Sequence, residues 1–106
     1  MDKFADRREA LESSVLRGPA ATAPEARRLA ATDPEALGGA RARYCGQVAR
    51  DANGVTDADV AALRAEGLGD REIFEYTVAA AVGRASAQIG AALAALAVVE
   101  ATEDPR

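Results

Sequence analysis

Few residues of this sequence could do chemistry. Its 106 residues include one cysteine, Cys45, and no histidine. Without histidine the chain lacks the commonest general base, the usual metal ligand and the usual partner of a catalytic serine or cysteine. The sequence also has no Cys-x-x-Cys pair, no glycine-rich phosphate loop and no acidic calcium loop. We therefore expect no metal and no cofactor, and the candidate catalytic groups are Asp59, Cys45 and Arg84.

Cys45 allows two interpretations. Arg41 and Arg43 lie close to it in sequence, and positive charge lowers the pKa of a thiol and makes it reactive. A lone cysteine on a helix is, however, more often a small buried apolar residue. Because the chain offers no base and no second cysteine to resolve an oxidised thiol, the sequence favours the buried interpretation.

Arg84 interrupts the apolar stretch of a long C-terminal helix. It could line a polar pocket between subunits, or it could be a solvated side chain on the outer face of that helix. Its position beside the apolar stripe favours the second interpretation. The candidate pocket residues are Tyr44, Glu75, Tyr76, Arg84 and Gln88.

The long helix is predicted from residues 71 to about 98, where apolar or small residues recur at steps of three and four. A helix of that length measures about 42 Å. Before it, Thr56 and Asp59 have the spacing of a capping box, which by itself accounts for an acid at position 59. Gly67 can take the left-handed position that ends a helix, and Asp70 would then cap the long helix.

Three further helices are predicted in the N-terminal half. The first spans residues 3–16, and the second begins after Thr22, whose hydroxyl would cap it, and ends near Thr32. The third runs over residues 33–52, where the Gly38-Gly39 pair is either a hinge or a weak helix start. No alternating strand pattern occurs in the sequence. We therefore predict one all-α domain over 1–106 with about five helices: N-terminal helices over 3–52, a helical core over 55–98 and a frayed tail over 100–106.

The composition predicts an oligomer. The chain has no tryptophan and only four other aromatic residues, two Phe and two Tyr, so its core must be small, and association is an economical remedy. The length of the predicted long helix also far exceeds the radius of gyration of about 13 Å that is expected for a compact domain of this size. Such a helix would extend beyond its own domain and meet a partner. Small residues would let a partner helix approach closely, and larger ones would supply buried anchors. The candidate interface residues are Ala81, Gly83, Ala85, Ile89, Ala92, Leu93 and Leu96.

The net charge and the cysteine content limit which partners and which cellular location we expect for this protein. The net charge is −4, with basic residues scattered among acidic ones, so we expect neither nucleic acid nor an anionic membrane surface as a partner. A membrane span is disfavoured because Arg84 and Gln88 fall near the middle of the apolar stretch. With one cysteine and no apolar signal segment at the N-terminus, the sequence predicts a cytoplasmic protein.

The run from residue 55 to 96, which begins VTDADVAALRAEGLGDREIF, is similar to the carboxymuconolactone decarboxylase and AhpD-like alkylhydroperoxidase superfamily. The resemblance implies an all-α fold with a core of helix, corner and long helix. It also implies subunits that associate as dimers, trimers or hexamers. The residues that carry it are Val60, Leu63, Arg64 and Gly67, then Glu72 and Ile73, then Ala79, Ala80, Ala81 and Gly83.

The same resemblance implies two chemistries, and this chain matches neither. The peroxidase branch has two cysteines and a histidine, and the decarboxylase branch keeps the histidine. Counted back from Gly67, these three positions hold Ala52, Val55 and Asp59, and a position where the family often has arginine holds Gln88. A thiolate relay needs two sulfurs within disulfide reach. The resemblance thus implies the scaffold without the redox site.

Three functions remain open. The first is a non-redox protein that acts as a homo-oligomer or as a structural, accessory subunit of a larger enzyme. The alternative is a cofactor-free decarboxylase or isomerase-like enzyme for a small carboxylate, in which Asp59 is the base and Arg84 holds the anion. The least favoured is a single-thiol peroxidase at Cys45.

Overall fold

The computed structural model describes residues 3–103, and all regular structure in that range is helical. This confirms the predicted all-α class. The five α-helices of the described range are α1 (Lys3–Arg17), α2 (Pro24–Thr32), α3 (Gly39–Asp51), α4 (Asp57–Ala65) and α5 (Asp70–Glu103), and two 3-10 helices, η1 (Pro34–Leu37) and η2 (Ala52–Gly54), lie between them.

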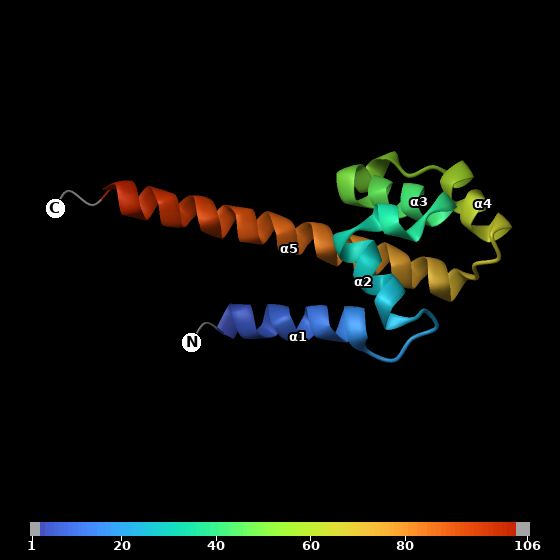
Figure 1. Cartoon of the computed structure of the whole chain (residues 1–106), viewed down its shortest axis with the longest axis horizontal. Coiled ribbons are helices and arrows are strands. Elements are labelled where there is room, and N and C mark those ends of the chain that lie inside the picture. The colour runs from blue at the N-terminus through green and yellow to red at the C-terminus, as the bar shows by residue number, and fades with distance from the viewer. Residues whose placement is uncertain (1–2, 104–106) are drawn as a thin grey trace.

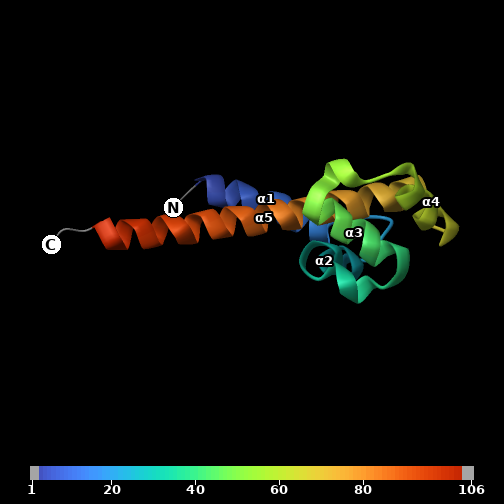
Figure 2. The same ribbon diagram turned by 90° about the horizontal axis from the view of Figure 1, so that it is seen from above.

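The molecule has a compact end and a projecting end (Figures 1 and 2). Helices α2 and α3 pack against the first part of α5, residues 70–83, α4 packs against α3, and together they form a helical head. Helix α1 runs alongside the middle of α5, and residues 90–102 of α5 extend beyond it as an exposed arm. The shape measures 61 × 28 × 21 Å, and the radius of gyration is 16.5 Å. A compact domain of this size would have about 13 Å.

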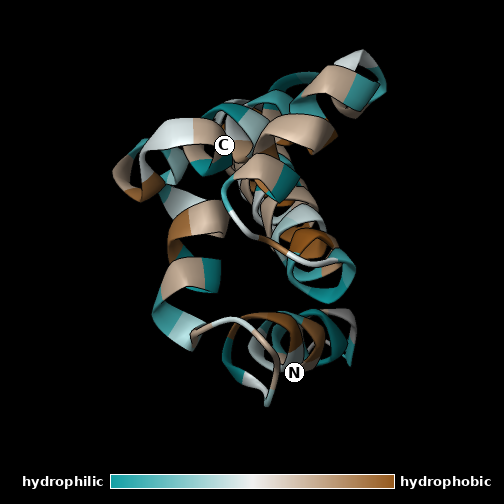
Figure 3. Cartoon of the chain, turned by 90° about the vertical axis from the view of Figure 1, so that its right-hand side faces the viewer, coloured by the Kyte–Doolittle hydropathy of each residue, from teal (hydrophilic) through white to brown (hydrophobic). Residues whose placement is uncertain are grey.

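The hydrophobic core lies in the head and is built mostly of small residues. Cys45 of α3 and Leu63 of α4 are the largest side chains that are fully buried among the described residues. Around them lie apolar residues of α2, α3 and α5. In Figure 3, hydrophobic residues of α1 lie on its side that faces α5. The other buried apolar residues are Ala30, Ala40, Tyr44, Val48, Ile73, Tyr76, Ala79 and Ala80.

Helix α4 and the corner that follows it form through local hydrogen bonds. At the start of α4, the Thr56 hydroxyl accepts the N–H of Asp59, and the Asp59 carboxylate accepts the N–H of Thr56, which is the predicted capping box. At the end of α4, the N–H of Leu68 donates to the carbonyl of Leu63, and Gly67 has a φ of 95°. This is the left-handed helix end that the sequence predicts at Gly67.

Two predicted caps are corrected by the structure. Ala23, not Thr22, precedes α2, and it makes no side-chain cap, because the Thr22 hydroxyl is bonded to Glu75 instead. Asp70 is the first residue of α5 rather than its cap. The acid that supports this helix start is Glu72, whose carboxylate accepts the N–H of Gly69 at 3.0 Å.

Two segment boundaries also differ from the prediction. The predicted third helix is divided at the Gly38-Gly39 pair, whose φ values of 72° and 56° no other residue type adopts readily. Helix α5 continues to Glu103, beyond the predicted end near residue 98. An exposed helix end needs only its own backbone hydrogen bonds, and residues 100–103 contain no Gly or Pro to end it. Residues 104–106 of the predicted frayed tail lie outside the described range.

Candidate functional site

Cys45 lies in the centre of the head and is fully buried. Burial raises the pKa of its thiol to about 11, and the nearby positive charge of Arg41 offsets only part of that effect. The thiolate is the reactive form of cysteine, so this thiol is both inaccessible and protonated near neutral pH. The geometry supports the interpretation of Cys45 as a small apolar core residue.

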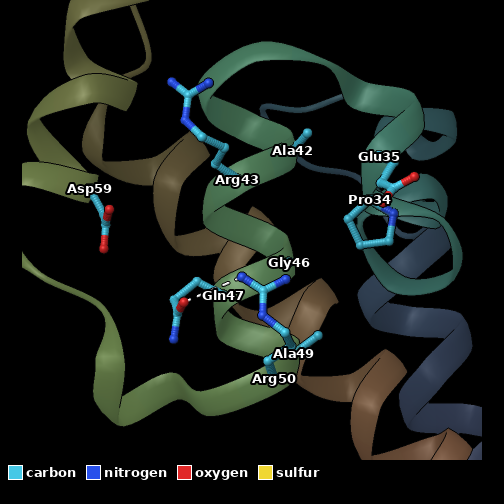
Figure 4. Close-up of a pocket in the computed structure, with 9 residues that line it drawn as sticks. All are labelled: Pro34, Glu35, Ala42, Arg43, Gly46, Gln47, Ala49, Arg50 and Asp59. Atoms are coloured by element: carbon cyan, nitrogen blue, oxygen red, sulfur yellow. Dashed lines mark hydrogen bonds between the residues drawn. The ribbon is translucent and has the colours of Figure 1, made fainter.

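Asp59 closes the capping box of α4 and borders a surface groove of about 580 Å³. In Figure 4 the Asp59 side chain lies on one side of α3, and Pro34 and Glu35 of η1 lie on the other. The groove is therefore spread over the surface of α3 and does not enclose the carboxylate. Its lining residues include Arg43, Arg50 and Gln47 but not Arg84. The base and the anion-binding group of the enzyme alternative are thus not brought together.

Glu75 is buried and holds the loop between α1 and α2 against α5. Its carboxylate accepts the N–H of Ala21 at 2.9 Å, the N–H and hydroxyl of Thr22 at 2.8 and 2.6 Å, and the Nε of Arg71 at 2.8 Å. Burial by itself would raise the pKa of Glu75, but the hydrogen bonds from Thr22, Ala21 and Arg71 outweigh it and lower the pKa to about 2. Glu75 is therefore an ionised structural group.

Both candidate tyrosines are buried in the contact between α3 and α5. The Thr77 hydroxyl donates to the carbonyl of Ile73 at 2.6 Å, so the Tyr44 hydroxyl, 2.7 Å away, must be the donor to Thr77. The hydroxyl of Tyr76 accepts a hydrogen bond from Arg41 at 3.2 Å. These partners lie within the same chain, as expected for buried tyrosines that stabilise helix packing.

The predicted pocket of Tyr44, Glu75, Tyr76, Arg84 and Gln88 does not assemble in the described chain. Tyr44, Glu75 and Tyr76 are each engaged in the head, while Arg84 and Gln88 are exposed further along α5. Arg84 is exposed in the single chain, as both of its interpretations require, so its role stays a prediction.

Arg27 is a buried structural residue that the sequence does not reveal. Only 2% of it is exposed, and its guanidinium donates to the carbonyls of Val15 and Gly18, each at 2.6 Å. A cation at the C-terminus of α1 satisfies carbonyls that the helix itself leaves unpaired. In the sequence Arg27 is one of two adjacent arginines on a short amphipathic helix, and nothing distinguishes the buried one from the exposed Arg28.

Gly83, one of the candidate interface residues, packs inside the chain. A Cβ atom at this position would overlap the backbone of Ala31 in α2. The close approach of a helix, which the small residues predict, is thus made here by α2 of the same chain. Ile89 is half-buried, and the remaining candidates are exposed on the outer surface of α5: Ala81, Ala85, Ala92, Leu93 and Leu96.

The arm exposes large apolar side chains. Leu93, Leu96 and Val98 are 55%, 53% and 63% exposed, and Val99 is 46% exposed. By length and composition the segment Asp70–Thr102 would suffice to cross a membrane. This is weak evidence for a span, because a single such helix passes the test by length and composition only. No part of its apolar window is buried in the described chain.

Comparison with protein-family models, with curated proteins and with solved structures gives no match. The resemblance to the AhpD-like superfamily therefore stays a prediction from the sequence. Within residues 3–103, no three His, Cys, Asp or Glu side chains are grouped so that they could hold a metal ion.

Proposed function

We propose that this protein is a non-redox, AhpD-like subunit that acts by assembly, as a homo-oligomer or as an accessory subunit of a larger enzyme. Its head is a self-contained helical unit, and its arm is the attachment surface. The observation that carries the proposal is the exposure of Leu93, Leu96 and Val98, each more than half exposed on one projecting helix. Soluble monomers rarely leave continuous apolar surfaces of this kind uncovered.

The roles of the candidate catalytic groups support the same proposal. Cys45 fills the core, Asp59 caps α4, and Glu75 joins the loop before α2 to α5. Each is accounted for by a contact that stabilises the fold. The enzyme alternative needs Asp59 and Arg84 at one site, and the groove beside Asp59 does not include Arg84. We therefore favour assembly over catalysis.

Native mass spectrometry of the protein, gently purified from its own source, tests this proposal. We expect a complex of defined stoichiometry, either of this chain alone or of this chain with a larger one. The variant Leu96→Glu should dissociate it, because a charge would be buried in the contact. Phe74→Glu is the matched control, because Phe74 is 62% exposed on the head and an equal change there should leave the mass unchanged.

Two results would contradict the proposal. One is a monomer at every protein concentration with no companion chain. The other is a monomer that retains a small carboxylate and loses it in Asp59→Asn, which would favour the enzyme alternative instead.

A further inference from the structure

One apolar stripe follows α5 from the side of α1 to the tip of the arm. The stripe residues recur at steps of three and four, the spacing by which paired helices contact each other. Val82 and Ile89 are half-buried, and the rest are exposed. A groove of about 370 Å³ between α1 and α5 continues the stripe through the exposed Leu11. The α5 stripe consists of Val82, Ala85, Ile89, Ala92, Leu96 and Val99.

The sizes of the stripe residues indicate how a second helix would lie on it. Ala85 and Ala92 lie nearer the head, and the larger Leu96 and Val99 lie nearer the tip. Two copies in antiparallel orientation place Leu96 of one opposite Ala92 of the other, and Val99 opposite Ile89. A parallel pair would instead place alanine opposite alanine and leave gaps, which interiors rarely contain. The antiparallel pair also keeps the two heads at opposite ends.

The charges at the two ends of this contact are complementary. In the antiparallel register, Glu100 of one copy comes level with residue 88 of the other, close to Ser86. The Ser86 hydroxyl accepts a hydrogen bond from Arg8 of α1 at 3.4 Å. The Arg8 guanidinium also lies 3.8 Å from the Glu12 carboxylate of its own helix, and its side chain stays 26% exposed. A carboxylate from a second copy would contact this exposed part, and such charge-assisted bonds favour one register over others.

We propose that two copies of this chain pair through the α5 stripe in antiparallel orientation, with Glu100 of each copy beside Arg8 of the other. This inference rests on the proposed function and commits the arm to one occupant, a second copy. The dimer is two-fold symmetric, so it contains the contact between Glu100 and Arg8 twice.

Disulfide trapping tests the orientation. Ala92→Cys and Leu96→Cys are prepared as separate chains, and each is oxidised alone and after mixing. The antiparallel pair predicts a mixed disulfide dimer far in excess of either homodimer, because a disulfide needs Cα atoms less than about 7 Å apart. The unchanged protein is the control, because its single thiol, Cys45, is buried and should form no dimer.

Charge reversal tests the contact at the ends. Glu100→Arg and Arg8→Glu should each raise the dissociation constant of the dimer, and the two changes in one chain should restore it. An exposed ion pair contributes up to about fivefold in affinity, and the dimer holds two. Arg84→Glu is the control, because Arg84 is exposed on α5 away from the stripe and should leave the dissociation constant unchanged.

The outcomes separate this inference from the proposed function. Homodisulfides of Ala92→Cys and of Leu96→Cys, with no excess of the mixed dimer, would show a parallel pair and overturn the inference while the assembly function stands. A dissociation constant that neither charge reversal changes would overturn the contact between Glu100 and Arg8. A monomer that floats with phosphatidylcholine vesicles would assign the stripe to a lipid surface and overturn both.

Discussion

Glu75 links two parts of the head that lie far apart in the sequence. Its four hydrogen bonds come from Ala21, Thr22 and Arg71, and three of them come from the loop before α2. Because all of these partners donate, only the ionised carboxylate satisfies them. The charge of this one side chain therefore controls how firmly the loop is held to α5.

The pKa of Glu75 predicts how stability changes with pH. Its folded pKa is lowered from 4.5 to about 2, so its contribution is complete above pH 4.5 and is lost as the pH falls toward 2. The contribution is on the order of 3 kcal/mol. Denaturant unfolding at a series of pH values should show that Glu75→Gln unfolds more easily at pH 7 and hardly differs from the unchanged protein near pH 2. Glu9→Gln, at an exposed position of α1, is the control and should change neither.

Cys45 should be unreactive while the head is folded. With a pKa of about 11, its thiolate fraction near neutral pH is about 300-fold below that of a free cysteine of pKa about 8.5. Alkylation by iodoacetamide, followed by mass spectrometry, should therefore be slower by at least that factor. In denaturant the same thiol should react at the rate of free cysteine. Fast labelling of the folded protein would instead favour a single-thiol peroxidase as the function.

At the scale of elements, the crossing of α2 and α5 depends on Gly83. A Cβ at this position would overlap the backbone of Ala31, whereas a Cβ at Gly90 of the same helix meets nothing within 4 Å. Replacing either glycine by alanine improves helix propensity by about 1 kcal/mol. Only Gly83→Ala adds the overlap.

We therefore expect opposite effects from these two substitutions in α5. Gly90→Ala should raise the melting temperature, and Gly83→Ala should lower it, because the helices must separate to accommodate a methyl group. Circular dichroism during heating measures both. An equal rise in the two variants would mean that α2 does not pack closely at Gly83.

Local elements could be predicted from the sequence, but contacts between them could not. The capping box of Thr56 and Asp59 and the left-handed Gly67 depend on neighbouring residues, and both are confirmed. The bond between Thr22 and Glu75 joins residues 53 positions apart, so the cap expected at Thr22 was wrong. At Gly83 the lack of a side chain predicted a closely packed helix without indicating whether that helix belongs to the same chain. The roles of the candidate site residues stay predictions, because they too depend on contacts between segments far apart in the sequence or between chains.

At the scale of the whole molecule, residues 90–102 of the arm are all exposed, so among the described residues only the arm's own backbone bonds hold it helical. Short helical segments without tertiary packing open readily in water, even when they are rich in alanine. Hydrogen exchange should therefore be fast at residues 92–102 in dilute protein and should slow as concentration rises and copies pair. The exchange rates of the α3 amides should not change with protein concentration, because α3 lies in the head. Equal rates in the arm at all concentrations would contradict pairing.

Helix α5 is a single uninterrupted helix from the corner at Gly69 to Glu103. At 1.5 Å per residue its 34 residues span about 50 Å. In an antiparallel pair, the distance between the two heads would depend on the number of residues in α5. Deletion of seven residues, two helical turns, from the arm would shorten the distance and keep the same faces aligned. In the proposed pair, the length of this one helix would therefore fix the separation of anything that the two heads bind.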